Sequence, residues 1–478
     1  MNFTIRIGLE VHIQLKTATK LFSDEPVTFE QKPNQSISPV TVGLPGTLPS
    51  LNQKAIDLTI ILALAANCKI NHQITFDRKI YFYPDLPKGY QITQKANPIG
   101  LQGAITYINH KKQIKKINIK QIHLEEDSAK LIYKDHQLLI DYNRAGIPLA
   151  EVVTYPELKS PEEAVSFLEY LKFLSKELNI SSGKMQMGAI RCDANISVNM
   201  PNKNIGYNEI KNLNSTKALK YALRYEIDRQ KNEFKNNTFK RGFTLSFDEQ
   251  QNKTIFSREK VSVADYGYII EPDILPITIT RSKIDTLKTK ISELPAKRFQ
   301  RLIQQYQLKK DVAYTISLNH DLSMIFESVY PEILNKQELI HFLLGPFKST
   351  DKKYAEKSYY NKKLKSNIIS LLNMITQNKI SRETAYQNLW PKLLVSKNKT
   401  TFELAKSNKW LLNHNETELL AIIKKIISEY PEEVEKYKNG KSKIIGLFMG
   451  QIMKRTKYRF QPQRAKLLLI EELNKINV

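Results

Sequence analysis

The sequence is poor in cysteine and has no long apolar run. Its two cysteines, Cys68 and Cys192, are too few for a disulfide framework or a cysteine-rich zinc site, and they suit a reducing cytoplasm. The longest apolar stretch, residues 55–68, is too short for a membrane span and already carries Asp57. We therefore expect a buried amphipathic helix there and no membrane contact. Residues 1–15 also lack the basic and then apolar pattern of a secretion signal.

Several common catalytic motifs are missing as well. The segment NGKS at 439–442 lacks the upstream glycine of a phosphate-binding loop, so it indicates a helix break. The chain has no G-x-S-x-G nucleophile elbow and no H-E-x-x-H zinc motif. Cys192 falls on the apolar side of an expected strand, where a structural role is far more common than a nucleophilic one. These absences exclude the usual P-loop, serine-hydrolase and zincin chemistries.

Negative charge is scarce relative to positive charge. The chain has 73 lysines and arginines against 48 aspartates and glutamates, and a formal net charge of +25. Such an excess favours a polyanionic partner such as nucleic acid. The chain is also rich in Lys, Asn and Ile, as a biased genome would produce, so charge alone leaves both explanations open.

The pattern of apolar residues changes twice along the chain. Up to about residue 280, short strand-like runs alternate with turn signals and two helices, expected at 160–180 and 215–234. Beyond that point the pattern is almost entirely helical, and it shifts again near residue 400. We therefore predict an α+β fold in three parts, with boundaries at 1–285, 286–402 and 403–478.

The expected strands carry an unusual set of polar side chains. Glu10 and His12 are two residues apart on a strand, so they point the same way, and Glu125 and Asp127 do the same while Glu126 points away. Further polar groups on neighbouring strands and turns are Asn143, Arg144, Glu151, Arg191, Asp193, Asn195, Glu209 and Lys211. One such strand alone is better explained as a solvated sheet face. Together, carboxylates, amides, one imidazole and isolated cations suit a concave sheet that binds Mg²⁺ and phosphate.

Two other regions combine aromatic and basic residues. The X-Pro-rich segment 76–94 places Lys79, Tyr81 and Lys88 on a stiff turn, which indicates either a packed aromatic loop or the wall of a conduit. The runs 351–365 and 454–466 interleave Lys and Arg with Tyr and Phe. They are typical of solvated helix faces, and they would also suit an RNA backbone with stacked bases.

Eight motifs give the chain a family resemblance. In order, they are IGLEVHIQL, VGLPGTLP, FDRKIYFYPDLPKGYQI, IHLEEDSAK, DYNRAGIPLAEVV, RCDANISV, EIKNLNS and LFMGQIMKRT. No single motif decides the matter, but the ordered set across nearly the whole chain resembles the GatB family, the B subunits of aspartyl/glutamyl-tRNA amidotransferase. The resemblance implies a cradle similar to glutamine synthetase (1–285), a helical linker domain (286–402) and a small tail resembling YqeY proteins (403–478).

The resemblance also implies an activity. Family members use ATP to phosphorylate the side-chain carboxylate of Glu-tRNA(Gln) or Asp-tRNA(Asn), and ammonia then displaces the phosphate. The ammonia comes from glutamine hydrolysed by a partner amidase subunit, GatA, and a small bridging subunit, GatC, completes the heterotrimer. By this resemblance the chain is part of a glutamine-dependent carbon–nitrogen ligase, and its missing nucleophile belongs to another chain.

The roles that the resemblance assigns are as follows. His12, Glu125 and Glu151 would hold Mg²⁺, with Glu10 and Asp193 near a second metal position; Glu125, Glu151, Arg191 and Asp193 would be catalytic. Asn143, Arg144, Asn195, Glu209 and Lys211 would contact nucleotide or substrate, and Lys79, Tyr81 and Lys88 would line the ammonia passage. Lys454, Arg455, Lys457, Arg459 and Arg464 would contact tRNA. Two other functions remain open: a non-catalytic tRNA-binding scaffold, and a free-standing ATP-dependent carboxylate–amine ligase that uses free ammonia.

The chain departs from the family pattern at three places. Gln186 and Met187 stand where the family usually has two acidic residues, which questions one site carboxylate. Gly267 in DYGYIIEPD replaces an arginine that could contact phosphate or a partner. The segment TKYRFQP replaces the tail's usual TKGKANP, which questions its RNA contacts.

Overall fold

The structure is a computed structural model of the chain. It describes residues 3–28, 31–185, 188–200, 207–236, 238, 242–259, 267–349, 362–396, 399–413, 415–456 and 458–476. Gln186, Met187 and Lys457 lie outside the described residues. The chain divides into two compact units, residues 1–318 and 319–478, which are described one at a time.

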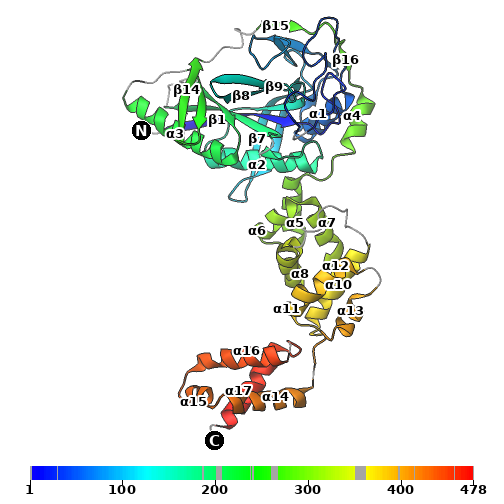
Figure 1. Ribbon diagram of the computed structural model, residues 1–478, viewed down its shortest axis with the longest axis vertical. Helices are drawn as coiled ribbons and strands as arrows, with labels where there is room; N and C mark the ends of the chain where they lie inside the picture. The colour runs from blue at the N-terminus through cyan, green and yellow to red at the C-terminus, as the bar shows by residue number, and fades with distance from the viewer. Residues whose placement is uncertain are drawn as a thin grey trace. The chain divides into compact units, whose positions relative to one another are not determined.

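A nine-stranded sheet forms the centre of the first unit (Figure 1). Its strands, in spatial order, are β14 (Lys253–Glu259), β13 (Phe243–Asp248), β12 (Asn208–Leu213), β11 (Ile190–Asn199), β1 (Thr4–Gln14), β10 (Pro148–Thr154), β7 (Ile114–Glu126), β6 (Gly100–Ile108) and β2 (Lys69–Ile70). Neighbours pair antiparallel except for β12 and β13, which are parallel. The strand predicted over residues 4–15 is β1, and it pairs on one side with β10 and on the other with β11.

One face of this sheet is apolar and covered by helices. Ile7, Leu9, Val11 and Ile13 of β1 are fully buried, as their alternation with polar residues predicts. The helices α1 (Gln53–Ala65), α2 (Pro161–Glu177) and α3 (Thr216–Lys235) supply the apolar side chains of this core. Ser160 and Ser215 cap α2 and α3 by accepting hydrogen bonds from the amides of Glu163 and Ala218. The opposite face keeps the polar side chains.

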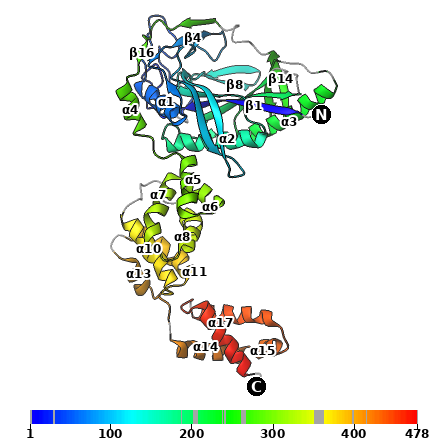
Figure 2. The ribbon, with the colours of Figure 1, turned by 180° about the vertical axis from the view of Figure 1, so that it is seen from behind.

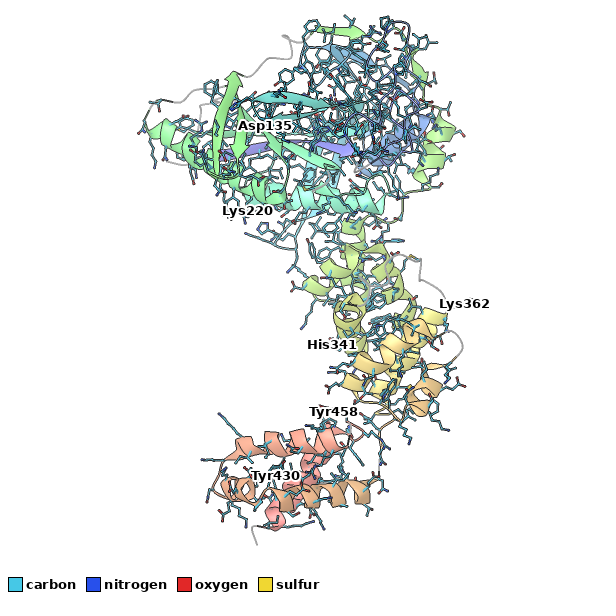
Figure 3. The ribbon with its side chains drawn as sticks, in the orientation of Figure 1. Asp135, Lys220, His341, Lys362, Tyr430 and Tyr458 are labelled. Atoms are coloured by element: carbon cyan, nitrogen blue, oxygen red, sulfur yellow. The ribbon has the colours of Figure 1, made fainter. Side chains whose placement is uncertain are left out.

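Three small sheets complete the first unit. They are β15 (Gly267–Ile270) with β4 (Asp77–Ile80) and β5 (Tyr90–Thr93); β8 (Lys130–Lys134) with β9 (Gln137–Asp141); and β16 (Ile277–Thr278) with β3 (Gln73–Ile74). The β8–β9 hairpin, with Asp135 at its turn, lies across the large sheet from α2 and α3 (Figures 2 and 3). The polar face therefore lies on the same side of the large sheet as this hairpin. The unit ends with α4 (Arg281–Lys288), α5 (Pro295–Tyr306) and α6 (Lys310–Ser317).

The described part of the second unit contains helices and no strand, as the sequence predicts. Its elements are α7 (His320–Val329), η3 (Tyr330–Glu332), α8 (Lys336–Phe342), η4 (Leu343–Phe347), α10 (Lys362–Thr376), α11 (Arg382–Thr384), η5 (Ala385–Leu389), α12 (Trp390–Val395), α13 (Thr401–Ser407), α14 (Glu416–Glu429), α15 (Pro431–Lys438), η6 (Ser442–Ile444), α16 (Ile445–Arg455) and α17 (Pro462–Lys475). A separate apolar cluster, which includes Ile423, Phe448 and Leu469, packs α14, α16 and α17 together. Gly440, with φ of 85°, separates α15 from α16, so the predicted helix break is confirmed.

The structure thus confirms the mixed α+β class and the change to an all-helical pattern after about residue 280. Within the described residues, no helix is both long and apolar enough to cross a membrane.

Candidate metal and substrate site

Three adjacent strands bring His12, Glu125 and Glu151 together on the polar face of the large sheet. His12 on β1 lies opposite Glu151 on β10, and Glu151 lies opposite His123 on β7. His12 Nε2 is 3.3 Å from Glu125 Oε1 and 3.7 Å from Glu151 Oε2. One donor atom from each residue lies within 4.8 Å of the others. In the chain as described, no other group of three or more such residues meets this spacing.

His123 belongs to the same cluster, although the sequence analysis did not assign it a role. Its Nε2 is 3.0 Å from Glu151 Oε2 and 3.6 Å from Glu125 Oε2, and the residue is almost completely buried. Its Nδ1 lies 3.2 Å from Gln121 Nε2. The alternation of β7 could have identified it, because His123 is two residues before Glu125 and shares its face.

The four side chains shift one another's proton affinities. Burial alone would lower the pKa of His12, but Glu151 and Glu125 outweigh it and raise that pKa to about 9. The pKa of His123 is raised to about 10 by the same carboxylates against the same effect of burial. Burial would raise the pKa values of Glu125 and Glu151, but the two histidines hold both of them below the ordinary value. The cluster therefore balances two carboxylates with two protonated imidazoles.

On the side away from β10, the end of β7 that carries Glu125 is supported by side chains rather than by a paired strand. The pairing of β7 with β6 ends at Ile122, opposite Gly100. Beyond it, the Leu124 amide donates to Gln94 Oε1 at 3.0 Å, and Gln91 Nε2 donates to the Glu126 carbonyl at 2.7 Å. Thr93 Oγ1 donates to Glu125 Oε2 at 3.1 Å. Residues of and next to β5 thus hold the carboxylate of Glu125 in place, and the sequence analysis missed them.

Lys88, one of the residues expected to line the ammonia passage, contacts β7 at Glu126, on the opposite side of the strand from Glu125. Lys88 Nζ donates to both Glu126 oxygens, at 2.6 and 2.8 Å, and the Ile92 amide donates to one of them at 2.9 Å. A Cβ added to Gly43 would lie 2.8 Å from Lys88 Cγ, so glycine lets this loop pack on the lysine stem. Glu126 is a second residue that the sequence analysis did not assign.

The other two residues of the expected passage lie on and just after β4. Lys79 on β4 is opposite Gln91 of β5, and its ammonium is 5.7 Å from the centre of the Tyr81 ring. Gly267, the position where the family has an arginine, pairs with Ile80 of the same strand. The β15–β4–β5 sheet therefore holds both Lys79 and the departure at Gly267.

A second polar group, on β1, β11 and β12, lies beside the cluster of His12, Glu125 and Glu151. Glu10 is opposite Asp193, and Asn195 Nδ2 donates to Glu10 Oε1 at 2.8 Å. Lys211 Nζ is 3.3 Å from both Asp193 Oδ2 and Glu209 Oε1. Burial, then Glu151, Glu209 and Asp193, raise the pKa of Glu10. A lysine ammonium thus lies between two carboxylates of this group.

Arg191, Arg144 and Asn143, all expected to serve the site, differ in what they can offer a ligand. Arg191 Nη2 pairs with Asp127 Oδ2 at 2.7 Å, beside the metal cluster. Arg144 donates to the carbonyls of Ser128 and Ala129. Asn143 binds backbone too, accepting from the Ser36 amide and donating to the Lys32 carbonyl. Both residues thus hold the loop in place, and Arg191 is the one nearest the cluster.

The residues expected to contact tRNA are partly neutralised. Arg455 forms a bidentate pair with Glu429, and Arg464 forms one with Glu416, at 2.6 and 3.0 Å. Lys454 is exposed. Two further findings concern the TKYRFQP segment. Arg459 has a buried Nε with no hydrogen-bond partner in the described chain, and Tyr458 adopts a φ of 57°, a region that favours glycine.

Comparison with known proteins identifies the family. Residues 5–285 match the GatB/GatE catalytic domain, and residues 324–473 match the GatB domain. A Clostridium novyi protein, named as the B subunit of aspartyl/glutamyl-tRNA(Asn/Gln) amidotransferase, is 37% identical over 99% of this chain and all of its own length. A protein of Clostridium botulinum (strain Langeland) with the same name is 36% identical over the full length of both chains. The cluster of His12, Glu125 and Glu151 and its neighbours all lie within the catalytic-domain match, and the chain belongs to the GatB family.

Proposed function

We propose that the chain is the B subunit of a glutamine-dependent aspartyl/glutamyl-tRNA amidotransferase. In this reaction ATP transfers its terminal phosphoryl group to the side-chain carboxylate of Glu-tRNA(Gln), Asp-tRNA(Asn) or both. Ammonia then displaces the phosphate and forms the amide. The observation that carries the proposal is the cluster of His12, Glu125 and Glu151 on the polar face of a sheet within the catalytic-domain match.

The cluster fits Mg²⁺ by its donor chemistry. Hard divalent cations prefer carboxylate oxygens and tolerate a single imidazole, and three donor atoms here converge within 4.8 Å. When bound, Mg²⁺ would neutralise charge that develops on the phosphates of ATP. Glu125 and Glu151 would supply the carboxylates, and His12 would bind once it has lost the proton it shares with them.

The chain's cations would receive the phosphate oxygens. Arg191 lies beside the cluster, paired with Asp127, and Lys211 lies between Asp193 and Glu209. Their carboxylate partners fix the position of both side chains, so neither would need to reorganise to meet a phosphate oxygen. Glu10 and Asp193 would lie near a second metal position. Thr93 and Gln94 would keep Glu125 in place while substrate binds.

The partners are those that the family resemblance implies. Glutamine would be hydrolysed by an amidase subunit, with a small bridging subunit completing the heterotrimer. Ammonia would pass Lys79, Tyr81 and Lys88 to reach the activated carboxylate. Residues 1–285, 286–402 and 403–478 would serve as the catalytic, helical and tRNA-binding parts, in the cytoplasm.

The test is a reconstituted complex incubated with ATP, Mg²⁺ and each mischarged tRNA. We expect ATP cleavage that requires charged tRNA, and amidation that requires glutamine or high ammonium. ATP cleavage that is absent under all conditions would favour a non-catalytic scaffold. Full activity of this chain alone with free ammonia would favour a free-standing ligase.

A further inference from the structure

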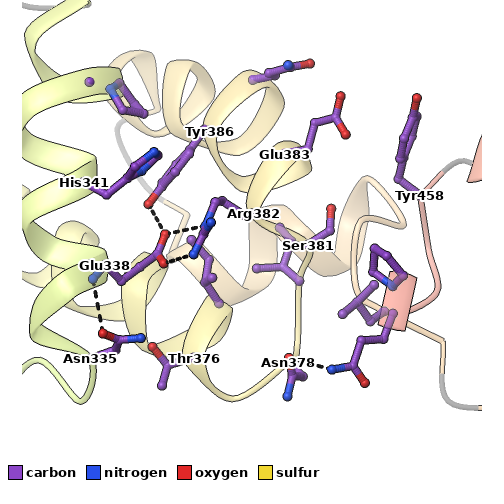
Figure 4. Close-up of a pocket in the computed structure, with 18 of the residues that line it drawn as sticks. Asn335, Glu338, His341, Thr376, Asn378, Ser381, Arg382, Glu383, Tyr386 and Tyr458 are labelled. Atoms are coloured by element: carbon purple, nitrogen blue, oxygen red, sulfur yellow. Dashed lines mark hydrogen bonds and ion pairs between the residues drawn. The ribbon is translucent and has the colours of Figure 1, made fainter. Parts of the chain in front are cut away.

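The second unit contains a pocket with no role in the proposed chemistry. Its volume is about 1130 Å³, and its main walls are α8, η4, the end of α10, α11 and η5 (Figure 4). All of these elements lie within the GatB domain match, residues 324–473. Large pockets lined by a few convergent polar groups are the usual places for ligands.

Two π-helical turns form facing parts of the wall. The backbone is π-helical at Leu343–Phe347 and at Ala385–Leu389. Such turns are rare and occur often at functional sites, because the extra residue changes the direction of the neighbouring side chains. Here His341 lies just before the first turn, and Tyr386 lies within the second.

A buried carboxylate organises the floor of the pocket. Glu338 is 3% exposed, accepts two hydrogen bonds from the Arg382 guanidinium and accepts a third from the Tyr386 hydroxyl. Figure 4 shows these three side chains pointing toward one another. The bidentate pair fixes the plane of the guanidinium, while the side chain of Arg382 stays 58% exposed. Glu338 thus fixes the Arg382 guanidinium and the Tyr386 ring in position at the surface of the pocket.

His341 and Tyr386 form a stack beside this pair. Their ring centres are 5.9 Å apart and their planes differ by 19°. Tyr386 is half-buried and His341 is exposed, so the imidazole is accessible from the pocket. We call His341, Tyr386 and Arg382 the stacking platform.

The stacking platform suits a planar, uncharged group. Glu338 neutralises Arg382, so the platform lacks the excess positive charge that a phosphate requires. Proteins bind unstacked RNA bases on the rings of His and Tyr and on guanidinium planes. The arginines expected to contact RNA at 455 and 464 are themselves paired with glutamates, so phosphate attraction there is reduced. The stacking platform instead offers RNA a surface on which a base can stack.

We infer that the stacking platform binds an unpaired base of the tRNA substrate. This inference rests on the proposed function and assigns part of its RNA contact to residues 338–386. A stacked base adds an RNA contact without a charge, whereas phosphate contacts position the backbone and carry no sequence information.

The test uses the whole amidotransferase complex and the substitution His341→Ala. Because His341 is exposed, its removal should leave folding unchanged. We expect the Kd for charged tRNA to rise about five- to a hundredfold, as for loss of one stacked base. The slope of log Kd against log salt should stay the same, since no phosphate contact is lost. The rate at saturating tRNA should also be unchanged, and His341→Phe should restore affinity.

Phe402→Ala is the matched control, because Phe402 is 46% exposed on α13 and lies outside the pocket. An unchanged Kd for His341→Ala, or an equal change for Phe402→Ala, would overturn the inference. A photo-crosslinking amino acid at position 341 gives an independent readout. Crosslinking to an unpaired nucleotide supports base binding, whereas crosslinking only to a partner subunit contradicts it. If the wild-type complex does not amidate tRNA at all, the proposed function fails first, and this affinity comparison still tests the platform.

Discussion

At the scale of single residues, Glu125 is the most closely held group in the site. It lies between His12 and His123 and accepts a hydrogen bond from Thr93. Both histidines owe their raised pKa values largely to Glu125 and Glu151. The two histidines therefore balance the carboxylate charge that a bound cation would otherwise offset.

Glu125→Gln should weaken cation binding strongly while the fold survives. The amide has the same shape but no charge, so it is a far poorer ligand for a hard cation. The histidines can lose their protons and so avoid a buried uncompensated charge. We expect Mn²⁺, used as a spectroscopic probe, to bind at least tenfold more weakly in electron paramagnetic resonance titrations. ATP cleavage and amidation should be lost together.

Glu249→Gln is the control for this variant, since Glu249 is exposed in a turn of the same unit. It should leave Mn²⁺ affinity and the melting temperature unchanged. Normal Mn²⁺ affinity of the Glu125→Gln complex would remove Glu125 from the ligand set. His12→Ala should weaken the binding less, because imidazole contributes less than carboxylate to such a cation.

We expect Thr93 to position Glu125 through its hydroxyl group, and a substitution that removes only this hydroxyl tests that role. Thr93→Val keeps the shape and removes the bond to Glu125 Oε2, which is worth about 1 kcal/mol. We expect cation affinity to fall about fivefold, and Thr93→Ser to restore it. Thr59→Val, which removes a buried hydroxyl bond inside α1, should lower the melting temperature without affecting cation affinity. Equal behaviour of the valine and serine variants at position 93 would contradict the positioning role.

At the scale of secondary-structure elements, β5 connects two parts of the expected chemistry. Its neighbour Lys88 pairs with Glu126, while its own Thr93 holds Glu125. The two carboxylates follow one another on β7, so the expected ammonia passage and the metal cluster share one strand end. A displacement of β5 would therefore alter both the Lys88–Glu126 pair and the hydrogen bond from Thr93 to Glu125.

Substitution of Lys88 should separate the two nitrogen donors. Lys88→Met alone would leave Glu126 buried without its cation, a destabilising change. We therefore pair it with Glu126→Gln, which removes both charges. If Lys88 lines the passage, amidation with glutamine should fall several-fold more than amidation with high ammonium. An equal loss with both donors would place the defect in carboxylate activation or in folding.

At the scale of the whole molecule, the net charge of +25 can attract RNA only where lysines and arginines are not already paired with carboxylates. In the segment expected to bind tRNA, Arg455 and Arg464 are each opposed by a glutamate, whereas Lys454 is exposed. Formal charge therefore overstates the attraction of this segment for RNA. The salt dependence of binding can count the contacts that remain.

Lys454→Ala should make the salt dependence of tRNA binding shallower by roughly 0.7–0.9 log unit, the value for one phosphate contact. The double substitution Arg455→Ala with Glu429→Ala removes a neutral pair, so it should leave the slope unchanged. Binding constants across a salt series, with melting temperatures for each variant, check both expectations. A shallower slope for the double variant would show that Arg455 leaves Glu429 to bind RNA.

The sequence by itself determined several of the elements and which of their residues share a face. Strict alternation in residues 4–15 specified a strand with Glu10 and His12 on one face, because side chains repeat every two residues. The motifs specified the family and, through it, the grouping of His12, Glu125 and Glu151. The change to a helical pattern after about residue 280 was equally local, since it depends only on spacing along the chain.

Only the tertiary structure decided which side chains meet. The place of β7 beside β10 brought His123 to Glu151, and the end of β6 at Gly100 left Gln94 and Thr93 to support Glu125. The pairing of Lys88 with Glu126, and of Arg455 with Glu429, joins residues far apart in the sequence. The same is true of the stacking platform. A one-dimensional pattern records which face a residue occupies, but contact across strands and helices depends on register and packing, which are set by the folded chain as a whole.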